Sequence, residues 1–531
     1  MNIMKAAEKR LLPTGIQSFE KLREFNAVYV DKTEFVYKLV HEVTPFFLSR
    51  PRRFGKSLLL STLRAYWEGK KELFKGLAIE QLEADNPDAW QPYPVFYFDL
   101  NGQDYTKPSA LENTLSTHLK TWEQQYECTT NEESLPIRFK NLLTAVHEKT
   151  GKRCVVLVDE YDKPLLDLSE HPELREHNKA VFKGFFGNLK SCDDHIRFVF
   201  ITGVTKYHKV SIFSDLNQLF DISLSEEFAA ICGITEDELR KCFSPEIKEM
   251  AEKQKIDEIV CMQKLKEYYD GYHFHQDGEG VYNPYSLLKA FFTKSFDSFW
   301  FESGTPTFLV KRLRSMGFDL RRLSNETLYA NASMLKDYSE DNPDPIPLLY
   351  QTGYLTIADY DPTAHEYTLA FPNNEVKYGF LECLMPEYVS DYGSGSGIDI
   401  FTLRRYINRG ELESIKNVLT ALFARITYTT KDTAFEHYFQ TVIYLVFTLL
   451  GQFTECEMHT FTGRIDCKVE TDKFIYLFEF KRDRSADEAL KQIDDKSYSL
   501  PFAADQRTLY KIGVSFDSEK RMLSDWKVIE A

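Results

Sequence analysis

The chain has 531 residues, of which 43% are hydrophobic and 14% aromatic, and this composition is sufficient for several packed cores. Its formal net charge of −16 argues against a protein that coats nucleic acid through surface charge, because phosphate neutralisation dominates such binding. Its 9 cysteines include no CxxC pair, which argues against a zinc ribbon or a disulfide framework and favours the cytoplasm. The most apolar run, at 442–450, is too short to span a bilayer, so we expect no membrane partner.

The first chemical signal along the chain is the stretch at 46–60, FFLSRPRRFGKSLLL, which predicts an apolar strand, a basic turn and a helix start. Gly55, Lys56 and Ser57 follow the turn. In this layout the helix N-terminus faces a phosphate, Lys56 neutralises it and Ser57 ligates Mg²⁺. The stretch therefore predicts an ATP and Mg²⁺ site. Arg50 stands where such loops usually carry their first glycine, and a solvated basic turn is the alternative interpretation.

Further elements alternate along the N-terminal half. We predict strands at 27–30, 95–100, 153–158, 197–203 and 220–224, with helices at 35–40 and within 108–149. Strands that alternate with helices favour an α/β fold with a doubly wound parallel sheet, whose ligand lies at the C-terminal edge of the strands.

Two carboxylates follow the most apolar of these strands. Asp159 is expected to hold Mg²⁺, and Glu160 to orient or deprotonate the attacking water. Thr202, at the end of the strand at 197–203, is a candidate contact to the γ-phosphate. For all three residues the alternative is a strand that simply ends in polar side chains.

Nine phrases spread along the chain form a recognisable set: YVDKTEF, SRPRRFGKSLLLSTL, VVLVDEYDKPLL, RFVFITGV, VSIFSDLN, GITEDEL, YYDGYHF, VYNPYSLL and QTGYLTI. In these phrases nearly the whole chain resembles the AAA-ATPase-like family found in many bacteria, whose members commonly carry a C-terminal nuclease domain of the PD-(D/E)XK superfamily. This resemblance implies that the Arg-Pro-Arg-Arg turn replaces the first loop glycine, and it adds Arg52 and Arg53 to the expected nucleotide-binding residues.

The resemblance also implies a domain order. We expect an ATPase core at 1–232, a helical lid at 233–297, a winged-helix-like region at 298–375, a helical connector at 376–425 and a nuclease-like domain at 426–531. The aromatic turn at 268–272 in the lid could stack on adenine, although packing between helices is the favoured interpretation.

The last hundred residues contain a second chemical unit with an α/β, restriction-endonuclease-like pattern. The spacing D-x12-E-x-K places Asp466 on one predicted strand and Glu479 and Lys481 on one face of the next. The two acids can hold Mg²⁺, and Lys481 can orient or deprotonate the attacking water. Related nucleases often carry a further acidic ligand on the preceding helix, where this chain has Glu436, and Gln492 matches a polar helix position of the family.

These observations together predict a cytoplasmic ATP-binding and ATP-hydrolysing enzyme with a metal-dependent nuclease domain. Its expected partner is nucleic acid, DNA in preference to RNA, and a homo-oligomer is left open. The alternative is an ATP-switched signalling or scaffold protein whose nuclease-like domain only binds a partner. The acidic charge favours this alternative, whereas the intact Asp466, Glu479 and Lys481 favour the enzyme.

Overall fold

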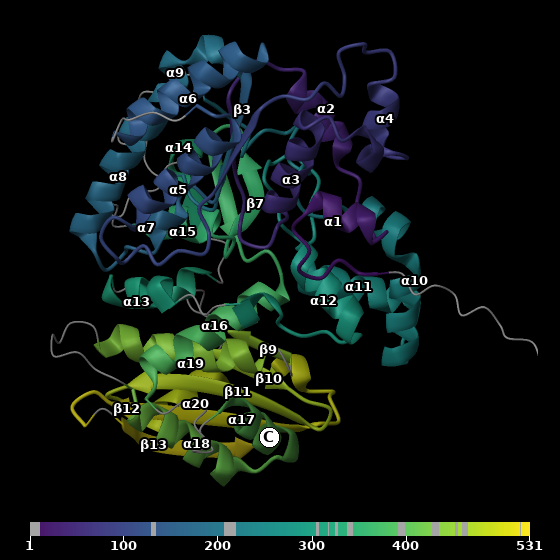
Figure 1. Cartoon of the computed structure of the whole chain (residues 1–531). Coiled ribbons are helices and arrows are strands. Elements are labelled where there is room, and N and C mark those ends of the chain that lie inside the picture. The colour runs from purple at the N-terminus through teal and green to yellow at the C-terminus, as the bar shows by residue number, and fades with distance from the viewer. Residues whose placement is uncertain are drawn as a thin grey trace, which may run out of the picture. The chain divides into compact units, whose positions relative to one another are not determined.

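The computed structural model describes residues 11–128, 134–206, 219–303, 307–316, 318–323, 328–336, 344–390, 399–426, 435–451, 455–458, 466–520 and 522–531. The chain forms two compact units (Figure 1). Unit 1 comprises Met1–Trp300 and Tyr329–Asn373, and unit 2 comprises Phe301–Leu328 and Asn374–Ala531. The finer division into five domains remains a prediction. Within the described ranges, no helix has both the length and the apolar character that crossing a membrane requires.

A five-stranded sheet forms the centre of unit 1, and each pair of neighbouring strands in it is parallel. The order is β2-β3-β4-β1-β5, so the C-terminal ends of all strands meet at one edge. This architecture confirms the predicted doubly wound sheet. The strands are β1 (Phe46–Ser49), β2 (Val95–Asp99), β3 (Cys154–Asp159), β4 (Ile196–Gly203) and β5 (Phe220–Asp221).

Helices cover both faces of this sheet because side chains alternate along each strand. On β2, the ring of Phe98 packs against Trp122 and Phe139 on one face, with ring centroids 4.9 and 5.5 Å away. The ring of Tyr97 lies on the opposite face, 5.8 Å from the guanidinium of Arg64 in α3. The helices of this region are α1 (Phe19–Glu24), α2 (Thr33–Val40), α3 (Lys56–Trp67), α4 (Ala78–Leu82), α5 (Ala110–Gln125), α6 (Leu135–Thr150), α7 (Lys163–Leu166), α8 (Pro172–Phe186) and α9 (Asn188–Ser191), with 3-10 turns η1 (Lys71–Phe74) and η2 (Asp193–His195).

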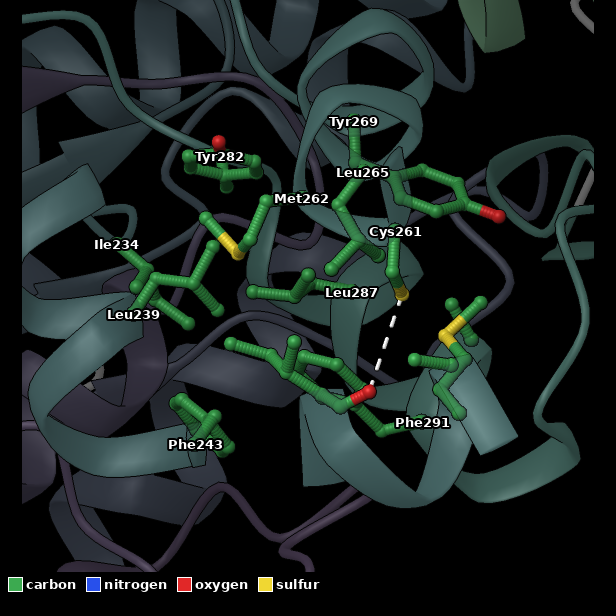
Figure 2. Packing of buried hydrophobic residues seen from close by; sticks show 14 of the residues in the cluster. Ile234, Leu239, Phe243, Cys261, Met262, Leu265, Tyr269, Tyr282, Leu287 and Phe291 are labelled. Atoms are coloured by element: carbon green, nitrogen blue, oxygen red, sulfur yellow. Dashed lines mark hydrogen bonds between the residues drawn. The ribbon is translucent and has the colours of Figure 1, made fainter. Parts of the chain in front are cut away.

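The segment expected to form a lid is helical, with α10 (Glu236–Gln254), α11 (Glu258–Tyr269) and α12 (Pro284–Thr293). Thr235 and Glu238 form a reciprocal capping box that fixes the start of α10. Figure 2 shows the apolar core that these helices share, in which Tyr269 and Tyr282 are fully buried. The aromatic turn at 268–272 therefore contributes to packing between elements, as the favoured interpretation expected.

Unit 1 continues in a three-stranded sheet of order β6-β8-β7. It lies in the region for which we predict a winged-helix-like domain, and β7 and β8 form an antiparallel hairpin. The elements are β6 (Leu328–Ala330), α14 (Ala332–Lys336), α15 (Ile346–Gln351), β7 (Thr356–Asp361) and β8 (Glu366–Ala370).

Unit 2 is built on a mixed five-stranded sheet of order β13-β12-β11-β10-β9, in which only the β11–β12 pair is parallel. Phe478 on β11 packs against Phe447 of α19 on one face, and Leu477 packs against Leu490 of α20 on the other. The strands are β9 (Glu455–Met458), β10 (Cys467–Glu470), β11 (Phe474–Arg482), β12 (Thr508–Asp517) and β13 (Met522–Glu530).

The helices of unit 2 include those expected as a connector, and these pack with the C-terminal sheet. The hydroxyl of Tyr476 in β11 donates a 2.6 Å hydrogen bond to the carbonyl of Ile407 in α17. The elements are η3 (Trp300–Ser303), which begins in unit 1, α13 (Thr307–Ser315), η4 (Leu320–Leu323), α16 (Asn374–Tyr388), α17 (Ile400–Arg409), α18 (Leu412–Ala424), α19 (Phe435–Leu450), α20 (Ala486–Asp495) and η5 (Leu500–Phe502).

Three local predictions differ from the structure. Residues 27–30 are not a strand, because β5 occupies the sheet edge beside β1. The strand expected at 220–224 ends at Asp221, and the chain then turns. We predicted no strand at 522–530, yet β13 lies there as an edge strand with mostly exposed or half-buried side chains, which blurs its alternating pattern.

Candidate ATP site and candidate nuclease site

The turn between β1 and α3 has the backbone of an anion-binding loop. Gly55, the N-cap residue of α3, has a φ of 92°, a conformation that suits glycine, and Arg53 has a φ of 70°. The main-chain N–H groups of residues 52–57 donate no hydrogen bond to any described residue. These N–H groups are therefore available to phosphate oxygens, and the partial positive charge at the N-terminus of the helix also attracts an anion.

Lys56 extends into this loop from the first position of α3. It is 4% exposed, and its ammonium donates to the carbonyls of Arg50 and Pro51 at 2.9 and 3.0 Å. Burial lowers the pKa of this ammonium, while nearby carboxylates, Glu160 foremost, oppose the shift. A phosphate that binds in the loop would replace these two neutral acceptors with charged ones.

Asp159 lies at the C-terminal end of β3, 1% exposed, and two hydroxyls hold its carboxylate. Thr202 on β4 donates to its Oδ1 at 2.8 Å, and Tyr97 on β2 donates to its Oδ2 at 3.2 Å. Both neighbouring strands therefore fix the side chain that we expect to hold Mg²⁺. Thr202 is fully buried, and whether it also contacts a γ-phosphate remains a prediction.

Glu160 follows directly and adopts a φ of 49°, which is unusual for a residue with a side chain. Burial raises the pKa of its carboxyl group, and the ammonium of Lys56 acts in the opposite direction. Asp162 is nearly fully buried and accepts hydrogen bonds from the main-chain N–H groups of Val204 and Thr205 and from the hydroxyl of Thr205. It ties the end of β3 to the end of β4, a role that our sequence reasoning missed.

The arginines of the turn have different surroundings. Arg52 and Arg53 are exposed, and the guanidinium of Arg53 lies 4.6 Å from the ring centre of Tyr285 in α12. Arg50 is 1% exposed and points beneath the loop. Of these three arginines, only Arg52 and Arg53 are therefore accessible from solvent, and their contact with a nucleotide remains a prediction.

An apolar cavity of about 100 Å³ opens beside Gly55. Its walls come from the segment before α2, from α3, from the chain before α10 and from the lid helices. Lys32 lines it too, but its ammonium is already bound to the carbonyl of Ala230 and to Glu238. The principal apolar lining residues are Val28, Val30, Leu58, Ile231, Phe243 and Leu288.

Asp466, the residue just before β10, meets Glu479 of the adjacent strand β11 in unit 2. The β10–β11 register pairs Cys467 with Phe478, so Asp466 lies opposite Glu479 one position further along. The main-chain N–H of Asp466 donates to Glu479 Oε2 at 3.4 Å, and the N–H of Phe480 donates to Asp466 Oδ2 at 2.8 Å. Glu479 is 1% exposed.

Lys481 lies on the same face of β11. Its ammonium donates to Glu479 Oε1 at 2.7 Å and to Oε1 of Gln492 in α20, also at 2.7 Å. Tyr498 lies near the same carboxylates. Burial raises the pKa of its hydroxyl, and the charge of Glu479 raises it further. Our sequence reasoning missed Tyr498, which lies six residues after Gln492 and is separated from it by the end of the helix.

The chemistry of these oxygen donors fits a hard divalent cation. Two carboxylates and one ammonium gather at a partly buried strand edge, so a cation would offset the repulsion between the acids. Among the described side chains, no group of three or more His, Cys, Asp and Glu residues forms a metal cluster. Glu436 belongs to α19, but its side chain lies outside the described part, and its proposed role as a ligand is untested.

Metal binding by unit 2 should weaken at acidic pH. Burial, and secondly the charge of Glu479, raise the pKa of Asp466 to about 6. Because a protonated carboxyl group cannot bind a cation, Mn²⁺ affinity should fall about tenfold per pH unit below that pKa and level off above it. Calorimetric titration from pH 5 to 7.5 measures this slope. A flat profile, or the same slope in Asp466→Asn, would contradict the assignment.

Comparison with known proteins agrees with this geometry. The AAA-ATPase-like family, described as "Predicted AAA-ATPase", matches residues 13–213, and the PD-(D/E)XK nuclease superfamily matches residues 434–526. The chain is also 35% identical over 527 residues to a protein of Azotobacter chroococcum mcd 1 described as "Uncharacterized protein in vnfD 5'region". That match covers 97% of this chain and 98% of the relative.

Proposed function

The chain belongs to the AAA-ATPase-like family and ends in a PD-(D/E)XK nuclease superfamily domain, and from that premise we propose that it binds and hydrolyses ATP and cleaves phosphodiester bonds in DNA with a divalent metal. The observation that carries the nuclease half is the joint placement of Asp466, Glu479 and Lys481. A binding module has no need to bury Glu479 against Lys481 and Asp466 at a strand edge, because buried charge is costly.

In unit 1, the loop N–H groups and Lys56 would bind the phosphates, and the apolar cavity beside Gly55 would take the nucleobase. Ser57 and Asp159 would hold Mg²⁺, which would offset the charge of the phosphates when bound. Glu160 would orient the attacking water and accept its proton, a role that the raised pKa of its carboxyl group supports.

In unit 2, Asp466 and Glu479 would hold Mg²⁺ or Mn²⁺, which would attract the scissile phosphate to an acidic chain. Lys481 would orient the attacking water and stabilise the charge that develops on the phosphate. Gln492 accepts a hydrogen bond from the same ammonium and so orients it. The alternative, a scaffold protein switched by ATP, has one observation in its favour, the net charge of −16.

Lys56→Ala tests the nucleotide half. A buried, charge-assisted contact to phosphate contributes roughly 1.5–3 kcal/mol, so the variant should bind ATP about ten- to a hundredfold more weakly. Calorimetry with ATP and Mg²⁺ measures the affinity. The matched control is Lys70→Ala just beyond the other end of α3, where the ammonium pairs with Glu20 and Glu68. Equal affinity in wild type and Lys56→Ala would refute ATP binding at this loop.

A further inference from the structure

Arg50 occupies the position where an ordinary phosphate loop carries its first glycine. Its contacts explain why an arginine can stand there. Arg50 is not among the residues of positive φ, so its backbone does not require glycine. Its guanidinium is buried beneath the loop. Nη1 donates to the carbonyl of Ser223 at 2.8 Å, Nη2 donates to the carbonyl of Phe228 at 3.0 Å, and the head group lies 3.9 Å from the ring centre of Phe274.

This buried cation is held by neutral groups. Its hydrogen bonds go to main-chain carbonyls, including its neighbour Ser49 at 2.9 Å, and no described carboxylate lies within ion-pair distance of it. Burial lowers the pKa of Arg50 to about 10, so the group stays charged at neutral pH. A buried charge that has no ion-pair partner among the described residues lowers stability, which indicates that the position does more than fill space.

The contacts of Arg50 lead directly to Lys56. The carbonyl of Arg50 accepts a hydrogen bond from the Lys56 ammonium, while its side chain clamps the same residue to the chain after β5. The two hydrogen bonds of the Arg50 guanidinium therefore fix the Arg50 carbonyl, and this carbonyl in turn fixes the position of the Lys56 ammonium. Lysine at this position cannot make both hydrogen bonds in the same geometry, because its ammonium lacks the planar, paired donors of a guanidinium.

We propose that Arg50 is a positioning residue for the nucleotide. From beneath the loop it sets the placement of Lys56, without touching the phosphates itself. The inference rests on the proposed ATP binding at this loop. It assigns the arginine of the Arg-Pro-Arg-Arg turn a role distinct from that of the exposed Arg52 and Arg53.

A double-mutant cycle tests the inference. Arg50→Lys and Arg50→Gln should each weaken ATP binding about tenfold when Lys56 is present, and by less than about twofold in a Lys56→Ala background. A purely structural role would lower thermal stability without this dependence on Lys56. Arg50→Lys keeps the charge and nearly the volume, so it decides the question if Arg50→Gln does not fold.

The matched control is Arg138→Lys in α6. Arg138 is 7% exposed and donates to both carboxylate oxygens of Glu123, at 2.9 and 2.8 Å. Its loss should lower the melting temperature and leave ATP affinity unchanged. Equal weakening by Arg50→Lys in both backgrounds, or no weakening in either, would overturn the role of Arg50. Unchanged affinity in Lys56→Ala alone would instead overturn the proposed ATP site.

Discussion

Replacing Lys481 with alanine is expected to abolish metal-dependent cleavage of DNA while leaving ATP affinity unchanged. The ammonium of Lys481 lies 2.7 Å from both Glu479 Oε1 and Gln492 Oε1, so the substitution removes a positive charge directly beside the carboxylate of Glu479. A side chain that transfers a proton or stabilises developing charge typically raises the reaction rate roughly 10²–10⁴-fold, so the cleavage rate should fall by that factor. Asp466→Ala should lower the rate at least as much, because it removes a metal ligand.

Lys511→Ala is the control for this experiment. Lys511 lies on the neighbouring strand β12, and its ammonium bonds to Asp494 of α20 at 2.7 Å. Like Lys481, it links its strand to α20, but it does not contact Asp466 or Glu479. Its loss should therefore leave the cleavage rate within about twofold of the wild-type rate. Wild-type cleavage by Lys481→Ala, measured as the rate of plasmid conversion at saturating Mn²⁺, would refute the assignment.

Glu160→Gln is expected to slow ATP hydrolysis by roughly 10²–10⁴-fold and to leave ATP affinity within about twofold. Glutamine has nearly the same shape, but it cannot accept the proton of the attacking water. The burial that raises the pKa of Glu160 also limits the access of bulk water, so water cannot readily accept the proton in its place. Steady-state phosphate release gives the rate, and calorimetry gives the affinity.

Asp167→Asn is the matched control for Glu160→Gln, since it removes a nearby carboxylate whose ion-pair partner among the described residues is Lys163, at 2.8 Å. Its hydrolysis rate should match that of the wild type. A Glu160→Gln variant that hydrolyses ATP at the wild-type rate would show that another group accepts the proton. A variant that no longer binds ATP would show that Glu160 belongs to the binding contacts instead.

Local patterns were sufficient to predict the sheet of unit 1 and the shared face of Glu479 and Lys481 on β11. Continuous apolar strands such as 154–158 have a distinctive sequence, and the two-residue period placed Glu479 and Lys481 on one face. The structure brings Asp466 to the same place because the β10–β11 register aligns the strand ends. The neighbours of Asp466, Glu479 and Lys481 are therefore set by strand geometry, which local spacing can predict.

The residues that support the sites were not predictable in this way. Tyr97 reaches Asp159 across 62 positions of sequence, and its alternating strand pattern is equally consistent with an exposed tyrosine. Arg50 has the side chain that is least expected to be buried, and only the tertiary fold supplies the carbonyls of Ser223 and Phe228 that hold it. Such long-range polar contacts leave no periodic signal.

One assay tests the central claim most directly: purified full-length protein with supercoiled plasmid, Mg²⁺ or Mn²⁺, and ATP, with an RNA arm in parallel. We predict that the plasmid is cleaved, that EDTA stops the reaction, and that Asp466→Ala is inactive although it binds ATP like the wild type. Wild-type protein that binds ATP but cleaves neither DNA nor RNA with either metal would contradict the nuclease assignment, and the ATP-switched scaffold would then be the better account.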